Sequence, residues 1–196
     1  MLYIYDDVDK LDDLPMDRLS GERREKALRH RFALGRKLSV GVYLLLCLAL
    51  KEEYGIEEAV VFGYNENGKP FLKDYPHIYF NLSHCKKAVA CAVSDNEIGV
   101  DIQDIRPVSD KVAKRVLTEA EYEEFKQAQS PEEYFCELWT AKESFLKRSG
   151  QGLRADLRKI SADGITEKTV YRGDGFFCCV TGLNVQIKRV GREDIG

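Results

Sequence analysis

Residues 36–54 constrain the fold more strongly than any other part of the chain, because they form a long and strongly apolar stretch. This composition predicts a helix that ends before Gly55. The unbroken apolar run at residues 40–50 is about half as long as a membrane span requires. A helix that is apolar on nearly all sides is typical of a protein core. We therefore expect a buried helix here and no membrane span.

The bulk composition is that of a globular protein, with 44% hydrophobic and 32% charged residues. A chain of 196 residues is long enough for one large domain or two small ones. The 30 basic and 33 acidic residues give a net charge of -3, which does not favour a nucleic-acid partner. The first ten residues lack the basic segment and apolar run of a signal peptide. We expect a cytoplasmic protein.

The cysteines favour a reducing environment over a metal site. None of the six is spaced C-x-x-C, and the chain has only three histidines, so a structural zinc site is not expected. We expect buried, reduced thiols. The six are Cys47, Cys85, Cys91, Cys136, Cys178 and Cys179.

Both halves of the sequence combine helical segments with a strand meander, which predicts an α+β fold. Thr118 begins a capping box, and Ser130 followed by Pro131 marks a second helix start, with that helix running to about Arg148. We place a boundary at residue 97, giving units 1–97 and 98–196. Expected helices are 20–31, 36–54 and 130–148, and expected strands are 2–5, 59–64, 78–82, 88–94, 98–102, 168–171, 176–181 and 184–190.

Two oxygen-bearing side chains, Asp101 and Gln103, stand two residues apart at the end of the expected strand 98–102. Alternate side chains share one face of a strand, so Val100 and Ile102 should point into the core while Asp101 and Gln103 point the other way. Such a pair suits a hard cation. A solvated strand face would show the same pattern, and this stretch alone does not decide between them.

The helix at residues 130–148 carries a second group of polar residues. Trp139, Glu143 and Lys147 recur every fourth residue and should line one helical face, with Lys142 beside them. An exposed Glu–Lys pair is the ordinary interpretation of this spacing. The tryptophan on the same face argues against a fully solvated stripe.

The strand end at residues 81–84 reads Asn-Leu-Ser-His, and Ser83 and His84 could hydrogen-bond an anion. A purely structural His84 is an alternative. A Ser-His hydrolase is another, but the chain has no G-x-S-x-G elbow and sequence adjacency is not triad geometry.

Basic residues gather near the N-terminus, where they form either a solvated face or a rim for phosphates. Lys69 adds a lysine in the turn Gly68-Lys69-Pro70. The N-terminal group comprises Arg23, Arg24, Lys26, Arg29, Arg31, Arg36 and Lys37.

In this order and spacing, the segments resemble the 4'-phosphopantetheinyl transferases of the surfactin-synthetase-activating type. That family has an Asn-x-Ser-His strand end, then Gly-Val-Asp-x-Glu, then Trp-x-x-Lys-Glu-x-x-x-Lys. The corresponding residues here are 81–84, 99–103 and 139–147. The Gly-Lys-Pro turn and Gln151-Gly152-Leu153 extend the resemblance.

The resemblance implies an enzyme that moves the phosphopantetheine arm of coenzyme A onto a serine of an apo acyl or peptidyl carrier protein, releasing adenosine 3',5'-bisphosphate. It also implies two similar α/β subdomains arranged as an intramolecular pseudo-dimer, with coenzyme A in the cleft between them. An internal pseudo-dimer favours a monomer. The expected partners are therefore coenzyme A and a carrier protein.

The resemblance further assigns roles to residues. Asp101 and Glu143 would hold Mg²⁺, with Glu143 also the base for the incoming serine. Lys142 and Lys147 would contact the phosphates, and Lys147 would support catalysis. Cofactor phosphates would also meet Lys69, Ser83, His84, Arg23, Lys26, Arg36 and Lys37.

The chain departs from the family pattern at Gln103, where a second carboxylate is common. We expect a two-carboxylate metal site in which Gln103 acts at most through water. A coenzyme A-binding protein with weak or lost transferase activity is the alternative that this departure leaves open. The amphipathic, basic segment 105–117, which follows Asp101, is either a docking surface for an acidic carrier protein or a helix packed on its own core.

Overall fold

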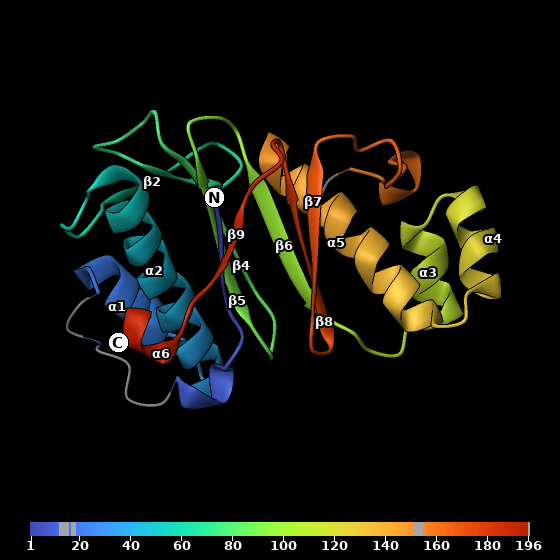
Figure 1. The fold of residues 1–196 in the computed structure, drawn as a ribbon, viewed down its shortest axis with the longest axis horizontal. Helices are drawn as coiled ribbons and strands as arrows, with labels where there is room; N and C mark the ends of the chain where they lie inside the picture. Colours follow the sequence, from blue (N-terminus) through green and yellow to red (C-terminus); the bar gives the residue numbers. More distant parts are fainter. Residues whose placement is uncertain (12–15, 17–18, 151–154, 196) are drawn as a thin grey trace.

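The structure is a computed structural model of the chain, and it describes residues 1–11, 16, 19–150 and 155–195. Two sheets stand at the centre, with helices on both outer sides (Figure 1). The first sheet has the order β4-β5-β1-β9 and the second β6-β8-β7. Their strands are β4 (Tyr79–His84), β5 (Val89–Ser94), β1 (Leu2–Tyr5), β9 (Ile187–Arg189), β6 (Gly99–Asp104), β8 (Phe176–Thr181) and β7 (Lys168–Gly173).

The first sheet buries both faces, as the alternation of its side chains requires. On β1, Tyr3 and Tyr5 belong to the core beneath helix α2 (Ala33–Tyr54), whereas Leu2 and Ile4 face the second sheet. Helix α1 (Gly21–Leu28) packs on α2, outside this layer. A short hairpin of β2 (Phe62–Tyr64) and β3 (Pro70–Leu72) adjoins β4.

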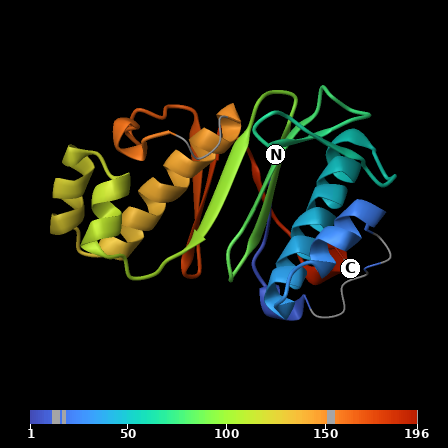
Figure 2. The same ribbon diagram turned by 180° about the vertical axis from the view of Figure 1, so that it is seen from behind.

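The two sheets share one apolar core. Val100 and Ile102 of β6 and Cys178 and Val180 of β8 pack against the β1 and β5 side chains. Helix α5 (Pro131–Ser149) covers the opposite face of the second sheet, where Ala141 meets Cys179. Figure 2 shows this order of layers from behind, with α2 and α5 on opposite sides of the sheets.

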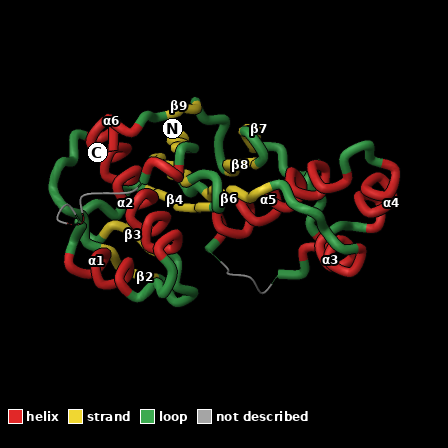
Figure 3. The backbone as a smooth tube through the Cα atoms, turned by 90° about the horizontal axis from the view of Figure 1, so that it is seen from below, coloured by secondary structure: helices red, strands yellow, loops and turns green. Residues whose placement is uncertain are grey.

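The remaining helices lie at the two ends of the molecule. Helices α3 (Asp110–Val116) and α4 (Glu119–Gln127) pack beside α5, away from the first sheet (Figure 3). Two short 3-10 helices are η1 (Val8–Lys10) and η3 (Leu157–Lys159). Strand β9 pairs in parallel with β1, and helix α6 (Arg192–Ile195) packs on α2. The C-terminal end therefore lies on the first half of the chain, whereas the boundary at residue 97 assigned it to the second.

The predicted α+β class is confirmed, and so is the buried helix. Helix α2 is long and apolar enough for a membrane span by length and composition, but 61% of its most apolar window is buried inside the protein. The capping box at Thr118 is present. Ser130 precedes α5 as predicted, although its side chain makes no capping hydrogen bond. The sequence interpretation did not identify β3, which has three residues, or α6, which has four.

All six cysteines are free thiols, as predicted. Five are buried and Cys47 is partly buried.

Candidate active site

The close approach of β6 to α5 begins at Gly99. A Cβ atom at this position would lie 2.0 Å from the Ser144 carbonyl oxygen and 2.5 Å from the Arg148 nitrogen. Only glycine allows backbone to meet backbone at this distance. The glycine thus brings the next residues of β6 that share its face, Asp101 and Gln103, against the same helix.

Asp101 is the centre of a polar cluster between β4, β6 and α5, and only 2% of it is exposed. Its Oδ1 accepts hydrogen bonds from Ser83 Oγ at 3.0 Å and from Lys147 Nζ at 2.6 Å. Lys147 Nζ also donates to Ser83 Oγ at 2.9 Å. Gln103 Nε2 donates to Asp101 Oδ2 at 3.2 Å. The prediction that Asp101 and Gln103 share a face away from the core is confirmed.

Side chains of β4 fix the position of β6 across the boundary between the two sheets. Asn81 Oδ1 accepts from the Val100 amide at 2.9 Å, and Ser83 Oγ accepts from the Ile102 amide at 3.3 Å. These bonds replace the backbone ladder that the two sheets do not share. The Asn-x-Ser-His segment therefore positions Asp101.

Glu143 is a second buried carboxylate beside Asp101, with 6% exposure. Burial raises the pKa of Glu143, the negative charge of Asp101 raises it further, and Lys147 opposes the shift. Two buried carboxylates balanced by one lysine leave an excess of negative charge, which favours a cation. Among the described residues, no cluster of three or more metal-ligating His, Cys, Asp or Glu side chains is found.

Glu143 and Lys147 line a cavity of about 280 Å³ that both halves of the chain enclose. Lys69 enters it from the β2–β3 turn, where its Nζ donates to the Arg148 carbonyl at 2.6 Å, at the C-terminal end of α5. Desolvation lowers the pKa of Lys69; the charge of Glu97 opposes this shift, and the charge of Arg148 adds to it. The remaining lining residues are Asn67, Gly68, Pro70, Asn81, Leu82, Leu146 and Gly150.

A second cavity of about 320 Å³ adjoins the first and shares with it Gly68, Pro70, Asn81 and Leu82. Its wall carries Arg23, Lys26, His30 and His84, and none of the described residues that line it is acidic. The shared wall makes the two cavities neighbouring parts of one cleft. The second cavity is the basic part of this cleft, and the first cavity contains the carboxylate of Glu143.

Arg23 is the most buried of these basic groups, at 4% exposure. Its guanidinium lies over the rings of Tyr43 and Phe62, and one nitrogen donates to the Ser39 carbonyl at 3.3 Å. Its Nε has no hydrogen-bond partner among the residues that the structure describes. Desolvation lowers the pKa of Arg23, and desolvation together with Arg23 lowers that of Lys26.

His84 joins the basic wall at the end of β4. Partial desolvation lowers the pKa of His84, and the positive charges of Lys147 and His30 lower it further. An accumulation of cationic groups that depress one another's pKa favours an anion in this cavity. His30 was not singled out in the sequence, where it stands between Arg29 and Arg31.

Two of the predicted N-terminal basic residues lie elsewhere. In the described part of the chain, neither Arg36 nor Lys37 lines these two cavities. Arg36 instead donates to the His30 carbonyl at 3.1 Å and so supports the loop that carries His30.

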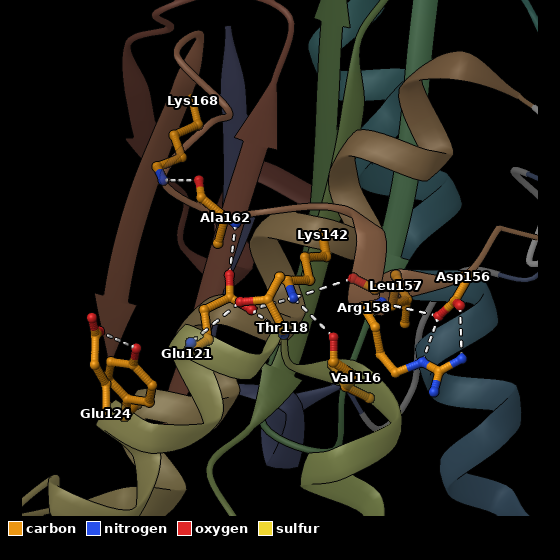
Figure 4. Close-up of polar contacts among 11 residues, drawn as sticks. Val116, Thr118, Glu121, Glu124, Lys142, Asp156, Leu157, Arg158, Ala162 and Lys168 are labelled. Carbon is orange, nitrogen blue, oxygen red and sulfur yellow. Dashed lines mark hydrogen bonds and ion pairs between the residues drawn. The ribbon is translucent and has the colours of Figure 1, made fainter.

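The expectation for Lys142 is wrong. We expected a phosphate contact, but the residue is fully buried on another side of α5. Its ammonium group forms an ion pair with Glu121 and donates to the carbonyls of Val116 and Leu157 (Figure 4). Successive residues of a helix point about 100° apart, so Lys142 cannot share the site of Glu143. The segment Gln151-Gly152-Leu153 lies outside the described residues.

A third cavity, of about 370 Å³, opens at the far end of β6 beside Gln103. Trp139 and Cys136 of α5 line it, with Val112 of α3 and Arg106 on the connecting loop. Trp139, Glu143 and Lys147 thus all face β6 or its cavities, which confirms that they share one side of the helix.

The fold and the site together define a class of protein: an α+β protein with paired buried carboxylates at the base of a basic cleft, an arrangement suited to a phosphate-bearing ligand. Residues 97–187 match the family described as the 4'-phosphopantetheinyl transferase superfamily. A 4'-phosphopantetheinyl transferase of Bacillus subtilis is 38% identical over 156 residues, covering 76% of this chain and 68% of that protein. The transferase Sfp of Bacillus subtilis strain 168 is 35% identical, covering 74% and 66%. The transferase psf-1 of Bacillus pumilus is 33% identical, covering 74% and 63%.

The chain belongs to the 4'-phosphopantetheinyl transferase superfamily. This confirms the predicted family and enzyme class. The chain spans between 63% and 68% of the length of these three relatives.

Proposed function

We propose that this protein transfers the 4'-phosphopantetheine group of coenzyme A to a serine of an apo acyl or peptidyl carrier protein, in a Mg²⁺-dependent reaction. The observation that carries the proposal is the meeting of Asp101, Glu143 and Lys147 at the base of a cleft whose other end is basic. Family membership supplies the class of reaction. The cationic side chains that line the two cavities support the proposal that coenzyme A binds there through its phosphates.

The basic cavity suits the 3'-phosphate of coenzyme A. Arg23, Lys26, His30 and His84 line it, and the described part of the chain contributes no carboxylate to this lining. The pyrophosphate would then lie in the adjoining cavity, near Lys69 and Lys147. A phosphate group binds well at a site where several cationic hydrogen-bond donors converge.

The donor set near Asp101 fits Mg²⁺, which prefers one or two carboxylates and takes its other ligands from phosphates and water. Asp101 and Glu143 would hold the ion. The amide nitrogen of Gln103 donates to Asp101, which is the role of a residue that orients a ligand. When bound, Mg²⁺ would neutralise charge on the pyrophosphate.

The residues of the chain divide the work of transfer. The serine oxygen attacks the phosphorus that bears the pantetheine arm, and the bond from that phosphorus to the bridging oxygen breaks. The serine proton passes to Glu143, whose raised pKa makes it a better base near neutral pH. Lys147 stabilises negative charge on the phosphate oxygens, and adenosine 3',5'-bisphosphate leaves.

We also propose that the two halves form an intramolecular pseudo-dimer. Each half places one long helix, α2 or α5, over an antiparallel part of a sheet, and the two sheets pack face to face. The carrier protein would dock on the basic segment after Asp101, where Lys111 and Lys114 are exposed on α3. A monomer would contain the complete cleft.

Incubation of the protein with coenzyme A, Mg²⁺ and a panel of apo carrier proteins tests the proposal. A mass increase of the carrier by one phosphopantetheine group is expected, and the Asp101→Asn and Glu143→Gln variants should lose it. Calorimetric binding of coenzyme A without transfer to any carrier would favour the alternative of a coenzyme A-binding protein. Absence of coenzyme A binding, with or without Mg²⁺, would refute both.

A further inference from the structure

The ion pair of Lys142 and Glu121 lies outside the cleft and is the most buried ion pair among the described residues. Lys142 is 0% exposed and Glu121 is 6% exposed. An ammonium group has three donors, and each has an acceptor here: Glu121 Oε2, the Val116 carbonyl at 2.8 Å and the Leu157 carbonyl at 3.3 Å. No donor is left for a substrate, so this lysine cannot contact the reacting atoms.

The Glu121 carboxylate is equally well satisfied. Its Oε2 accepts from the Thr118 amide at 2.8 Å, which closes the capping box of α4. Its Oε1 accepts from the Ala162 amide at 2.8 Å. Figure 4 shows the result: two side chains connect the end of α3, the start of α4, the middle of α5 and the segment from Leu157 to Ala162.

Such a pair is not an efficient way to stabilise a core. Desolvation of two charges offsets most of their attraction, and apolar side chains of similar size often do as well. The hydrogen bonds to four backbone groups are directional, whereas apolar packing is not. They fix how α5 is rotated and how far it is advanced relative to α3 and α4.

Both the rotation of α5 and its position along its own axis affect the proposed active site. Glu143 follows Lys142 directly, and Lys147 stands one turn further along the same helix. Trp139 of α5 and Val112 of α3 form two walls of the cavity beside Gln103. A rotation of α5 would move the catalytic carboxylate and change the shape of this cavity together.

We propose that Lys142 and Glu121 are positioning residues, whose buried ion pair sets α5 against α3, α4 and the 157–162 segment so that Glu143 and Lys147 meet Asp101. The inference rests on the proposed function for its catalytic consequence. The alignment of α5 itself can be measured without any activity.

The test uses Lys142→Met, which keeps the length of the side chain, and Glu121→Gln, which keeps its shape. Leu45→Ala is the matched control, because Leu45 is a fully buried core residue of α2 and belongs to neither site. Thermal melting first identifies a temperature at which all variants are folded. Three quantities are then compared: coenzyme A affinity in EDTA, kcat with Mg²⁺ and a carrier protein, and the fluorescence of Trp139, the single tryptophan.

We expect Lys142→Met and Glu121→Gln to bind coenzyme A in EDTA within about twofold of the parent protein, because the basic cavity lies in the other half. Their kcat should fall about 100-fold, the loss typical of a misplacement of about 1 Å. Acrylamide quenching of Trp139 should change in both variants. Leu45→Ala should alter neither kcat nor Trp139.

Several results would overturn the inference. Unchanged Trp139 fluorescence would show that the pair does not set α5, whatever happens to kcat. Altered fluorescence with kcat within threefold of the control would show that the alignment is irrelevant to the reaction. Lost coenzyme A affinity in EDTA would point to a direct effect on the cleft. If the parent protein transfers nothing, the proposed function fails, and the fluorescence comparison alone still decides whether the pair positions α5.

Discussion

Substitution of Gly99 by alanine should separate β6 from α5 and disable the site while leaving the fold in place. The added Cβ would lie 2.0 Å from the Ser144 carbonyl, and ordinary contact begins near 3.4 Å, so the two elements must move apart by roughly 1.4 Å. Both opposing atoms belong to the backbone, so no side chain can rotate away. The hydrogen bond from Lys147 Nζ to Asp101 Oδ1, now 2.6 Å, would stretch beyond hydrogen-bond range.

We expect a stability loss of about 3 kcal/mol, the upper part of the range for overpacking. In a chain of this size that corresponds to a melting temperature lower by about 6–12 °C. Calorimetry should show coenzyme A binding that Mg²⁺ no longer strengthens, because Asp101 and Glu143 no longer stand together. Gly164→Ala is the control, since its Cβ meets nothing closer than 3.4 Å. An unchanged melting temperature, or full Mg²⁺ dependence in Gly99→Ala, would refute the close-contact argument.

Three further predictions concern charged side chains of the cleft and of α3. In Mg²⁺-free buffer at pH 7, Glu143→Gln should raise the melting temperature, because the raised pKa of Glu143 makes its ionised form costly in the folded state. The difference in melting temperature should disappear below about pH 4, where the Glu143 carboxyl is protonated in the folded and the unfolded state. Lys26→Ala should weaken coenzyme A binding about tenfold by calorimetry and leave dephospho-coenzyme A, which lacks the 3'-phosphate, unaffected. Substitution of Lys111 and Lys114 by glutamate should raise the KM for the carrier protein in steady-state kinetics. An equal rise in the KM for coenzyme A would contradict a docking role.

Much of the site could be predicted from the sequence because its residues lie on regular elements. The period of two on β6 placed Asp101 and Gln103 on one face, and the period of four on α5 aligned Glu143 with Lys147. The structure brings these two faces together. What periodicity could not supply is the distance between them, which depends on Gly99 and on the β4 side chains of Asn81 and Ser83.

Other features depended on long-range contacts with no local signal. The pairing of β9 with β1 joins residues from opposite ends of the chain. His30 enters the basic cavity because the loop between α1 and α2 turns it inward, and Arg36 supports that loop through the His30 carbonyl. A run of basic residues does not reveal which of its members faces the cleft.

The error at Lys142 shows how a compact motif can serve two sites. The motif at residues 139–147 combines positions that a helix separates: Glu143 and Lys147 lie one turn apart and face Asp101, whereas Lys142 points away toward Glu121. The family resemblance implied that Lys142 contacts the phosphates, yet its three donors are bonded to α3, α4 and η3. In our proposal, one short segment thus supplies reacting groups on one face and, on another, the lysine of the ion pair that holds those groups in place.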